Sequence, residues 1–280
     1  FKINKTYLVK LNENLNLSNN ILGHCNPKSS TGRLDIFCRT IVDYAEEYEK
    51  IPLNYKGELF IEITPRSFNI QLKEGDKLNQ LRLAYLKHNY LNDKKLNKLN
   101  SDTKILINYN IKNKINNGLI LSVDLSKSNS IIAYEAKIDC PIIKFNNINY
   151  HDIKKYWKAI KFDKNNLIIK KNKFYILKSK EKIVIPSGYA GEMVPYDTGI
   201  GDFRVHYAGF FDPGFGNPNG SFAVLEVKTN EVPFILEDGQ TIARIRYEKL
   251  NKNSKIVYGS KINSSYQNQE LNLSKHFRMK

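Results

Sequence analysis

The chain has 280 residues with a formal net charge of +16, and its hydrophobic fraction of 41% is typical of globular proteins. No apolar run approaches the roughly 18 residues that a membrane-spanning helix needs, so we expect a cytosolic protein with no membrane partner. Lysine and asparagine are spread along the whole chain rather than clustered with aromatic residues, so we do not expect a nucleic acid partner, although the positive charge would favour a small polyanion.

Most apolar segments are short, rich in Ile, Val, Phe and Tyr, alternate with polar residues and end at Gly, Pro or Asn, which predicts a mainly β protein. In chain order, the clearest predicted strands are 58–63, 68–72, 119–125, 174–179, 203–211, 222–228, 233–236 and 243–250. Two segments, 77–89 and 152–160, are predicted to form short helices. The stretch 91–117, dense in Lys and Asn, is predicted to be a linker with some order.

The sequence contains one long internal repeat. Residues 58–83 align with residues 222–247 without a gap, at a constant offset of 164 (226 − 62 and 239 − 75), which pairs Glu62 with Glu226 and Gly75 with Gly239. This indicates a duplicated domain rather than a solenoid, whose repeats are ~20 to 50 residues long. We therefore expect a first domain at 1–90, with its N-terminal strand upstream of Phe1, and a second at 118–280.

The stretch NPKSSTGRLDIF, at 26–37, places two serines, a threonine, a glycine and an arginine close together. Hydroxyls and backbone amides of a tight turn can bind phosphate oxygens, and the guanidinium of Arg33 could clamp the same group in a bidentate manner. By itself, the pattern also fits an ordinary turn capped by a surface arginine.

A second candidate site is FRVHYAGFFDPGFGNPNGSFAVLEV, at 203–227. A strand with His206 and Ala208 runs into a turn at 212–215, and a second strand returns with Glu226 among apolar residues, which predicts a hairpin. An unpaired carboxylate in such a strand is costly. Glu226 is therefore expected either in a structural ion pair or with a raised pKa that serves chemistry.

These motifs together resemble a known family. PKSSTGRLDIF resembles the phosphate motif of the dCTP deaminase and dUTPase superfamily, and AGFFDPGFG followed by AVLEV resembles its dCTP deaminase branch. The terminal YGSKINSSYQNQELNLSKHF is similar to the tail that folds over the nucleotide in that branch. The resemblance covers nearly the whole chain and implies the long, tandem form of the family. Its fold would be two dUTPase-like (β-clip) domains, each a distorted β-barrel with a few short helices.

The resemblance also implies roles for individual positions. The triphosphate of dCTP would be held by Lys28, Ser29, Ser30, Thr31, Gly32 and Arg33. Ser29 and Arg33 would also reach the catalytic water, which the carbonyl of Ala208 would help to fix. Glu226 would be the general acid and base. The remaining substrate contacts would come from Asp212 to the deoxyribose, the backbone at Val224 and Leu225 to the cytosine edge, and Tyr258 and Gln269 over the phosphates. Ser265 departs from the family, which has a lysine there.

Each copy of the repeat carries only part of this set. The second copy has VPYDTG where a serine and arginine motif would stand, and the first keeps Glu62 without the Asp-Pro-Gly-Phe turn. The resemblance implies sites formed between subunits of a homo-oligomer, a trimer or a multiple of one. The first copy would then donate the phosphate loop and the second the chemistry, which leaves Glu62 with a structural role.

Most nucleobase deaminases activate water with zinc and carry H-x-E and P-C-x-x-C motifs, and this sequence has neither. The three cysteines Cys25, Cys38 and Cys140 also form no C-x-x-C pair, so we expect reduced, mostly buried thiols. We expect no metal ligands and no tightly bound cofactor, with Mg²⁺ only as a counter-ion of the triphosphate.

The resemblance implies that dCTP is converted to dUTP and ammonia, which would supply dUTP for dTTP synthesis, with dTTP a candidate inhibitor. Three alternatives stay open. A dUTPase or a bifunctional enzyme on the same fold would yield dUMP and diphosphate. A non-catalytic nucleotide sensor would bind dCTP or dTTP without turnover.

Overall fold

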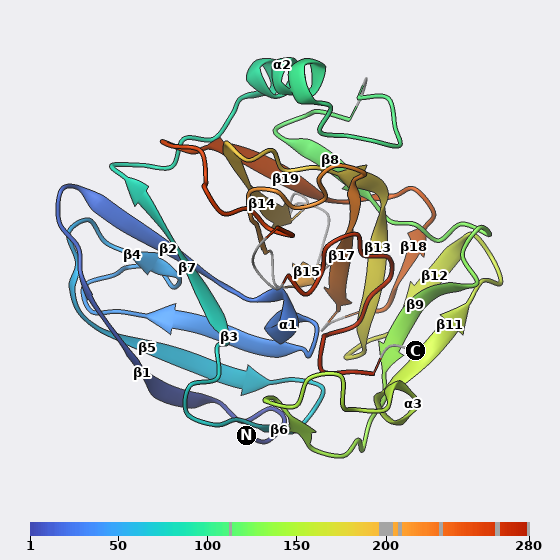
Figure 1. Ribbon diagram of the computed structural model, residues 1–280. Coiled ribbons are helices and arrows are strands. Elements are labelled where there is room, and N and C mark those ends of the chain that lie inside the picture. The colour runs from blue at the N-terminus through green and yellow to red at the C-terminus, as the bar shows by residue number, and fades with distance from the viewer. Residues whose placement is uncertain (112–113, 196–203, 207–208, 230–231, 261–263, 279–280) are drawn as a thin grey trace. The chain divides into compact units, whose positions relative to one another are not determined.

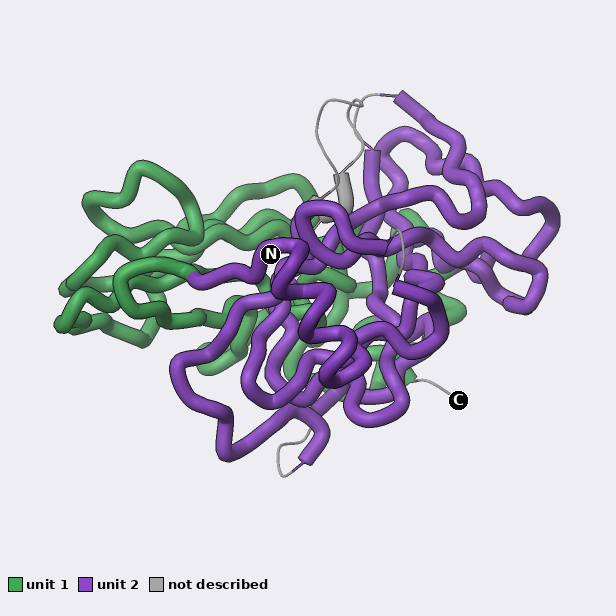
Figure 2. The backbone as a smooth tube through the Cα atoms, turned by 90° about the horizontal axis from the view of Figure 1, so that it is seen from above, with its two compact units in different colours: residues 1–88, 137–157, 274–280 green, residues 89–136, 158–273 purple. Residues whose placement is uncertain are grey.

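The computed structural model describes residues 1–280 apart from 112–113, 196–203, 207–208, 230–231, 261–263 and 279–280, and the side chains of 195 and 204–206 are also not described. The chain forms two compact units (Figure 2). Unit 1 contains 1–88, 137–157 and 274–280, and unit 2 contains 89–136 and 158–273. The compact units therefore do not follow chain order, because two segments that come after residues of unit 2 in the sequence belong to unit 1.

The fold is mainly β, as the alternating sequence pattern predicts. The described residues contain nineteen strands and three helices (Figure 1). Every sheet has an open strand order, so no closed barrel is formed among these residues. None of the three helices has the length and apolar character that crossing a membrane requires.

Unit 1 is built on two three-stranded sheets. One has the order β1 (Tyr7–Asn16), β5 (Lys56–Pro65), β3 (Ile36–Ile41), and the other has the order β4 (Lys50–Ile51), β2 (Ile21–Pro27), β7 (Asn79–Tyr85). Its remaining elements are the parallel pair β6 (Ile70–Gln71) and β10 (Ile143–Lys144), and the one-turn helices α1 (Ser29–Gly32) and α3 (Ile153–Tyr156). Buried side chains from both three-stranded sheets, such as Cys25, Ile51 and Leu59, share one hydrophobic cluster.

Unit 2 contains a five-stranded sheet, a four-stranded sheet and a strand pair. The first has the order β11 (Trp157–Lys161), β9 (Ile131–Ala136), β13 (Phe174–Ile183), β17 (Ser221–Lys228), β15 (Arg204–His206). The second has the order β16 (Phe210–Phe211), β14 (Tyr189–Pro195), β19 (Thr241–Lys249), β8 (Leu119–Ser122), and the pair is β12 (Asn166–Ile169) with β18 (Phe234–Glu237). The main core lies between the larger sheets, where Tyr175 and Tyr247 are fully buried.

The internal repeat is visible in the backbone. The aligned segments form β5, β6 and β7 in unit 1 and β17, β18 and β19 in unit 2. Gly75 and Gly239 both have positive φ, +87° and +80°. The strands paired with β5 and β17 are irregular at the same place, between Lys10 and Asn14 in β1 and between Lys178 and Lys182 in β13. The two copies thus share a β-bulge that the gapless alignment did not include.

Four strand predictions, 58–63, 174–179, 222–228 and 243–250, correspond to β5, β13, β17 and most of β19. The predicted helix at 77–89 is wrong, because residues 79–85 form β7 and pair with β2. The predicted helix at 152–160 is partly right, since α3 has four residues before β11 begins at Trp157. The predicted strand at 203–211 divides into β15 and β16, which belong to different sheets. Between them lies Ala208, outside the described residues.

The stretch expected to be a linker contains the longest helix of the described chain, α2 (Asp93–Thr103). The side chain of Asn92 caps it by accepting a hydrogen bond of 3.0 Å from the backbone N–H of Lys95. Lys104, with φ +48°, ends it in the left-handed conformation. Leu96 and Leu99, three residues apart, are its buried contacts with the core of unit 2. Two leucines in a polar stretch are a weak signal, which is why the sequence did not predict this helix.

Candidate active site

The predicted phosphate loop, residues 28–33, follows β2 in unit 1. Lys28 is extended and residues 29–32 form the single turn α1, in which the N–H groups of Thr31 and Gly32 both donate to the carbonyl of Lys28 at 2.8 and 3.0 Å. The N–H of Lys28 donates to the carbonyl of Leu78 at 2.9 Å, which joins the loop to the residue before β7. The motif is therefore a fixed backbone turn and not a flexible surface loop.

The side chains of this loop differ in accessibility. Ser30, Thr31 and Arg33 are at most 3% exposed, whereas Lys28 and Ser29 are half-buried. The Thr31 hydroxyl donates to the carbonyl of Leu78 at 2.8 Å, so this side chain fastens the loop to its own unit. Lys28 and Ser29 are the positions whose side chains are most accessible to a ligand. A buried Arg33 contradicts the interpretation of this arginine as a surface cap.

Glu226 lies on β17, which is buried along its whole length. Leu225 and Val227 belong to the core of unit 2, so Glu226 lies on the opposite face of the strand because side chains alternate. In register it pairs with Ile176 of β13 and with His206 of β15, which confirms the predicted hairpin. Glu226 is 5% exposed. The carboxylate is therefore held away from bulk water without being part of the main core.

Val224 and Lys178 are neighbours of Glu226 on this sheet and pair with each other in register. Lys178 is 7% exposed, and its ammonium lies 3.5 Å from Asp124, 3.1 Å from Glu270 and 4.4 Å from the centre of the Phe222 ring. The charge of this lysine is thus balanced by two carboxylates, and its ammonium lies over an aromatic face.

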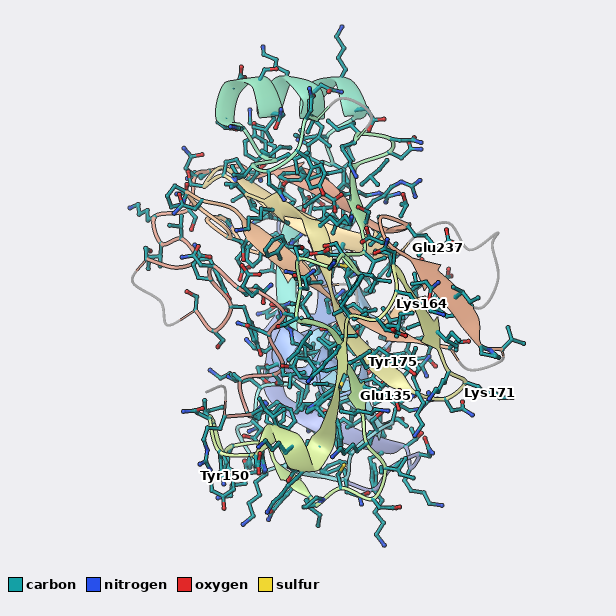
Figure 3. The ribbon with its side chains drawn as sticks, turned by 90° about the vertical axis from the view of Figure 1, so that its right-hand side faces the viewer. Glu135, Tyr150, Lys164, Lys171, Tyr175 and Glu237 are labelled. Atoms are coloured by element: carbon teal, nitrogen blue, oxygen red, sulfur yellow. The ribbon has the colours of Figure 1, made fainter. Side chains whose placement is uncertain are left out.

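The opposite face of the sheet is fixed by a half-buried polar contact. The Tyr175 hydroxyl donates to Glu135 at 3.0 Å, which joins β13 to β9, and Figure 3 shows these two side chains next to each other. Burial raises the pKa of Tyr175, so its hydroxyl stays protonated as a donor. This contact stabilises the strand that lies beside Glu226.

The turn at 212–217 precedes β17 and depends on two glycines. Gly214 and Gly216 have φ of +94° and +74°, and a Cβ on Gly216 would lie 2.0 Å from the carbonyl oxygen of Ile183. Only glycine combines this backbone conformation with so close an approach. Asp212, the predicted deoxyribose contact, is exposed at the start of the turn.

The tail segment around Tyr258 and Gln267 holds this turn. The N–H of Tyr258 donates to the carbonyl of Pro213 at 2.7 Å, and the Tyr258 ring lies 5.8 Å from that of Phe215. Gln267 accepts from the N–H of Gly216 at 3.1 Å and donates to the carbonyls of Gly214 and Asn217 at 3.3 and 3.1 Å. Sequence reasoning missed Gln267, although it lies two residues before the predicted Gln269.

Gln269 contacts β17 directly. Its side-chain amide donates to the carbonyl of Phe222 at 2.7 Å, and its backbone N–H donates to the hydroxyl of Ser221 at 3.1 Å. The predicted residues Tyr258 and Gln269 are therefore brought together with the turn and with the strand of Glu226, all within unit 2. Ser265 is exposed.

Glu62, the repeat partner of Glu226, has different surroundings. In register it pairs with Arg39 of β3, the position that His206 occupies opposite Glu226. The guanidinium of Arg39 lies 2.8 Å from the Glu62 carboxylate, and it stacks 3.8 Å above the Tyr48 ring. An acid held in this way has its charge compensated, which fits the structural role expected for Glu62.

Comparison with known proteins identifies the family. Two family models match the chain, the N-terminal domain of 2'-deoxycytidine 5'-triphosphate deaminase at residues 2–87 and its C-terminal domain at residues 92–277. The chain belongs to the dCTP deaminase family. A crystal structure of 2'-deoxycytidine 5'-triphosphate deaminase from Agrobacterium tumefaciens is 40% identical with a TM-score of 0.85, over 91% of this chain and 76% of that chain. No curated protein sequence matches.

Family membership confirms the resemblance that the three motifs carried and identifies the activity of the chain as hydrolytic deamination of dCTP. The part of the chain that the structure describes contains no group of three or more His, Cys, Asp or Glu side chains arranged to hold a metal ion. Cys25, Cys38 and Cys140 are free thiols, the first two buried and the third half-buried.

Proposed function

We propose that this chain deaminates dCTP to dUTP and ammonia by a metal-independent route in which Glu226 moves the protons. The observation that carries the proposal is the carboxylate at 5% exposure on the non-core face of β17, the strand that follows a glycine turn fixed by the tail. Such a site keeps a base away from bulk water while leaving one face of the strand for a substrate. The lack of H-x-E and P-C-x-x-C motifs supports the same route.

In this mechanism, the Glu226 carboxylate takes one proton from water as the oxygen adds to C4 of cytosine, and it passes that proton to N3. The remaining hydroxyl proton then moves through Glu226 to the exocyclic amine, the C4–N bond breaks, and ammonia leaves. Water is consumed, and uracil keeps its oxygen at C4. Proton transfer of this kind supplies about 10² to 10⁴ in rate, so orientation of the water must supply the rest.

The other predicted residues would provide this orientation. Ser29, Arg33 and the carbonyl of Ala208 would hold the water, and the backbone at Val224 would read the cytosine edge. Lys28 and Ser29 offer the most accessible side chains of the phosphate loop to the triphosphate, with Mg²⁺ as its counter-ion. The first copy of the repeat would thus donate phosphate binding and the second the chemistry.

The wider setting is proposed on the same basis. We propose a cytoplasmic homo-oligomer, a trimer or a multiple of one, that supplies dUTP as a precursor of dTTP. Inhibition by dTTP is the expected form of regulation, because dTTP carries the same triphosphate. Binding studies with dTTP and the mass of the native assembly in solution test these two points.

The test uses a matched pair of substitutions at the two repeat positions. With dCTP as substrate, Glu226→Gln should abolish ammonia release while dCTP binding is retained, and Glu62→Gln should keep the activity. Ammonia release by the wild type should persist when trace transition metals are chelated. Equal loss in both variants, or loss on chelation, would contradict the mechanism. Ion-exchange separation of the products decides the alternatives, since dUMP would indicate the bifunctional enzyme and binding without turnover a sensor.

A further inference from the structure

The C-terminal segment 274–278 belongs to unit 1 and contacts the phosphate loop of that unit. Ser274 and His276 have no exposed surface. The carbonyl of Lys275 accepts from the N–H of Asn149 at 2.9 Å, and the carbonyl of His276 accepts from the N–H groups of Tyr150 and His151, both at 3.0 Å. These hydrogen bonds fix the backbone at Lys275 and at the residue after it.

A short hydrogen-bond chain links this segment to the loop. The Ser274 hydroxyl lies 2.8 Å from the carbonyl oxygen of Ser30 and 2.8 Å from Nδ1 of His276. A carbonyl only accepts, so the hydroxyl donates to Ser30 and must accept from a protonated Nδ1 of His276. Burial, with the nearby charge of Lys275, lowers the pKa of His276 to about 4, so the ring is neutral at pH 7.

The side chain of Lys275 is half-buried between these two anchors. Burial and the positive charge of Lys28 together lower the pKa of Lys275, so the two ammonium groups act on each other. Lys28 is the first residue of the phosphate loop. Two like charges that act on each other repel, and a polyanion that binds both removes this repulsion.

We propose that Lys275 binds the triphosphate of the nucleotide together with Lys28, and that Ser274 and His276 are positioning residues that hold Lys275 at the loop. This inference rests on the proposed function for the identity of the nucleotide. It adds to the site a cation to which the family resemblance assigns no role, although the tail motif contains it. The anchoring explains how a residue 247 positions after Lys28 (275 − 28) reaches the same place.

The test compares Lys275→Gln with Lys155→Gln, which removes the same charge from an exposed position of unit 1. Calorimetric titration with dCTP, inorganic tripolyphosphate and deoxycytidine separates phosphate binding from base binding. For Lys275→Gln we expect about tenfold weaker binding of dCTP and tripolyphosphate, a KM raised by a similar factor and a nearly unchanged kcat. Deoxycytidine binding should not change, and Lys155→Gln should match the wild type.

Two further variants make the result decisive. Lys275→Arg should retain most of the affinity because it keeps the charge, and Ser274→Thr should retain more of it than Ser274→Ala because it keeps the hydroxyl. Unchanged dCTP and tripolyphosphate affinity in Lys275→Gln, or equal losses in the Gln and Arg variants, would overturn the proposal. A wild type that binds tripolyphosphate but releases no ammonia would instead contradict the proposed function alone.

Discussion

His276 makes the stability of this protein depend on pH. Its ring is neutral in the folded chain because burial lowers its pKa from 6.5 to about 4, while the unfolded chain keeps the ordinary value. Between these two values the unfolded state binds more protons, so the stabilising contribution is complete above pH 6.5 and is lost as the pH falls toward 4. The difference between a pKa of 6.5 and one of about 4 corresponds to at most about 3 kcal/mol of unfolding free energy.

The substitution His276→Asn isolates this contribution. An asparagine amide can still donate to the Ser274 hydroxyl from near the place of Nδ1, but it does not titrate. Urea unfolding at pH 7.5 and pH 4.5 should show that the wild type loses about 2 to 3 kcal/mol more than the variant over this range. His151, whose pKa is also lowered by burial, is present in both proteins. Equal losses in the two proteins would refute the assignment of a neutral, buried His276.

Three further outcomes are expected. Gly216→Ala should destabilise the chain by more than about 2 kcal/mol in urea unfolding, whereas Gly239→Ala, with no atom within 4 Å of its Cβ, should cost only about 1 kcal/mol of backbone strain. Glu181→Gln should cost about 3 kcal/mol by the same measurement, because it leaves Lys114 without its fully buried partner at 2.7 Å. Gln267→Ala should lower kcat/KM for dCTP about tenfold in an ammonia-release assay, because it frees the turn at 212–217.

Local patterns in the sequence predicted local features of the fold. Short apolar segments rich in Ile, Val, Phe and Tyr, which alternate in part with polar residues, identified β5, β13 and β17, and the gapless repeat placed Gly75 and Gly239 at equivalent turns. The same pattern failed at 77–89, where Leu81, Leu83 and Tyr85 are three alternating residues within a segment that also fits helical spacing. This segment forms a strand because it pairs with β2, and a local sequence pattern does not indicate pairing with a strand 50 residues or more away.

The parts of the candidate site that could be predicted are those in which the residues lie within one short segment of the sequence. The loop 28–33 and the hairpin of Glu226 are contiguous motifs, and the sequence indicated both. Contacts made by the tail were not predictable, because Gln267 and Ser274 act through the backbone carbonyls and amides of distant residues. A carbonyl has no sequence signature, so such partners become apparent only in three dimensions.

The bulge shared by β1 and β13 bears on how the duplicated halves diverged. Both copies keep the same irregularity opposite the same pair of positions on β5 and β17, so the backbone around each acid has been preserved. What differs is the residue across the ladder, an arginine opposite Glu62 and a histidine opposite Glu226. Exchanging one cross-strand neighbour is thus a short mutational path by which an ancestral pair of equal domains could specialise, with one acid held in an ion pair and the other taking the proposed catalytic role.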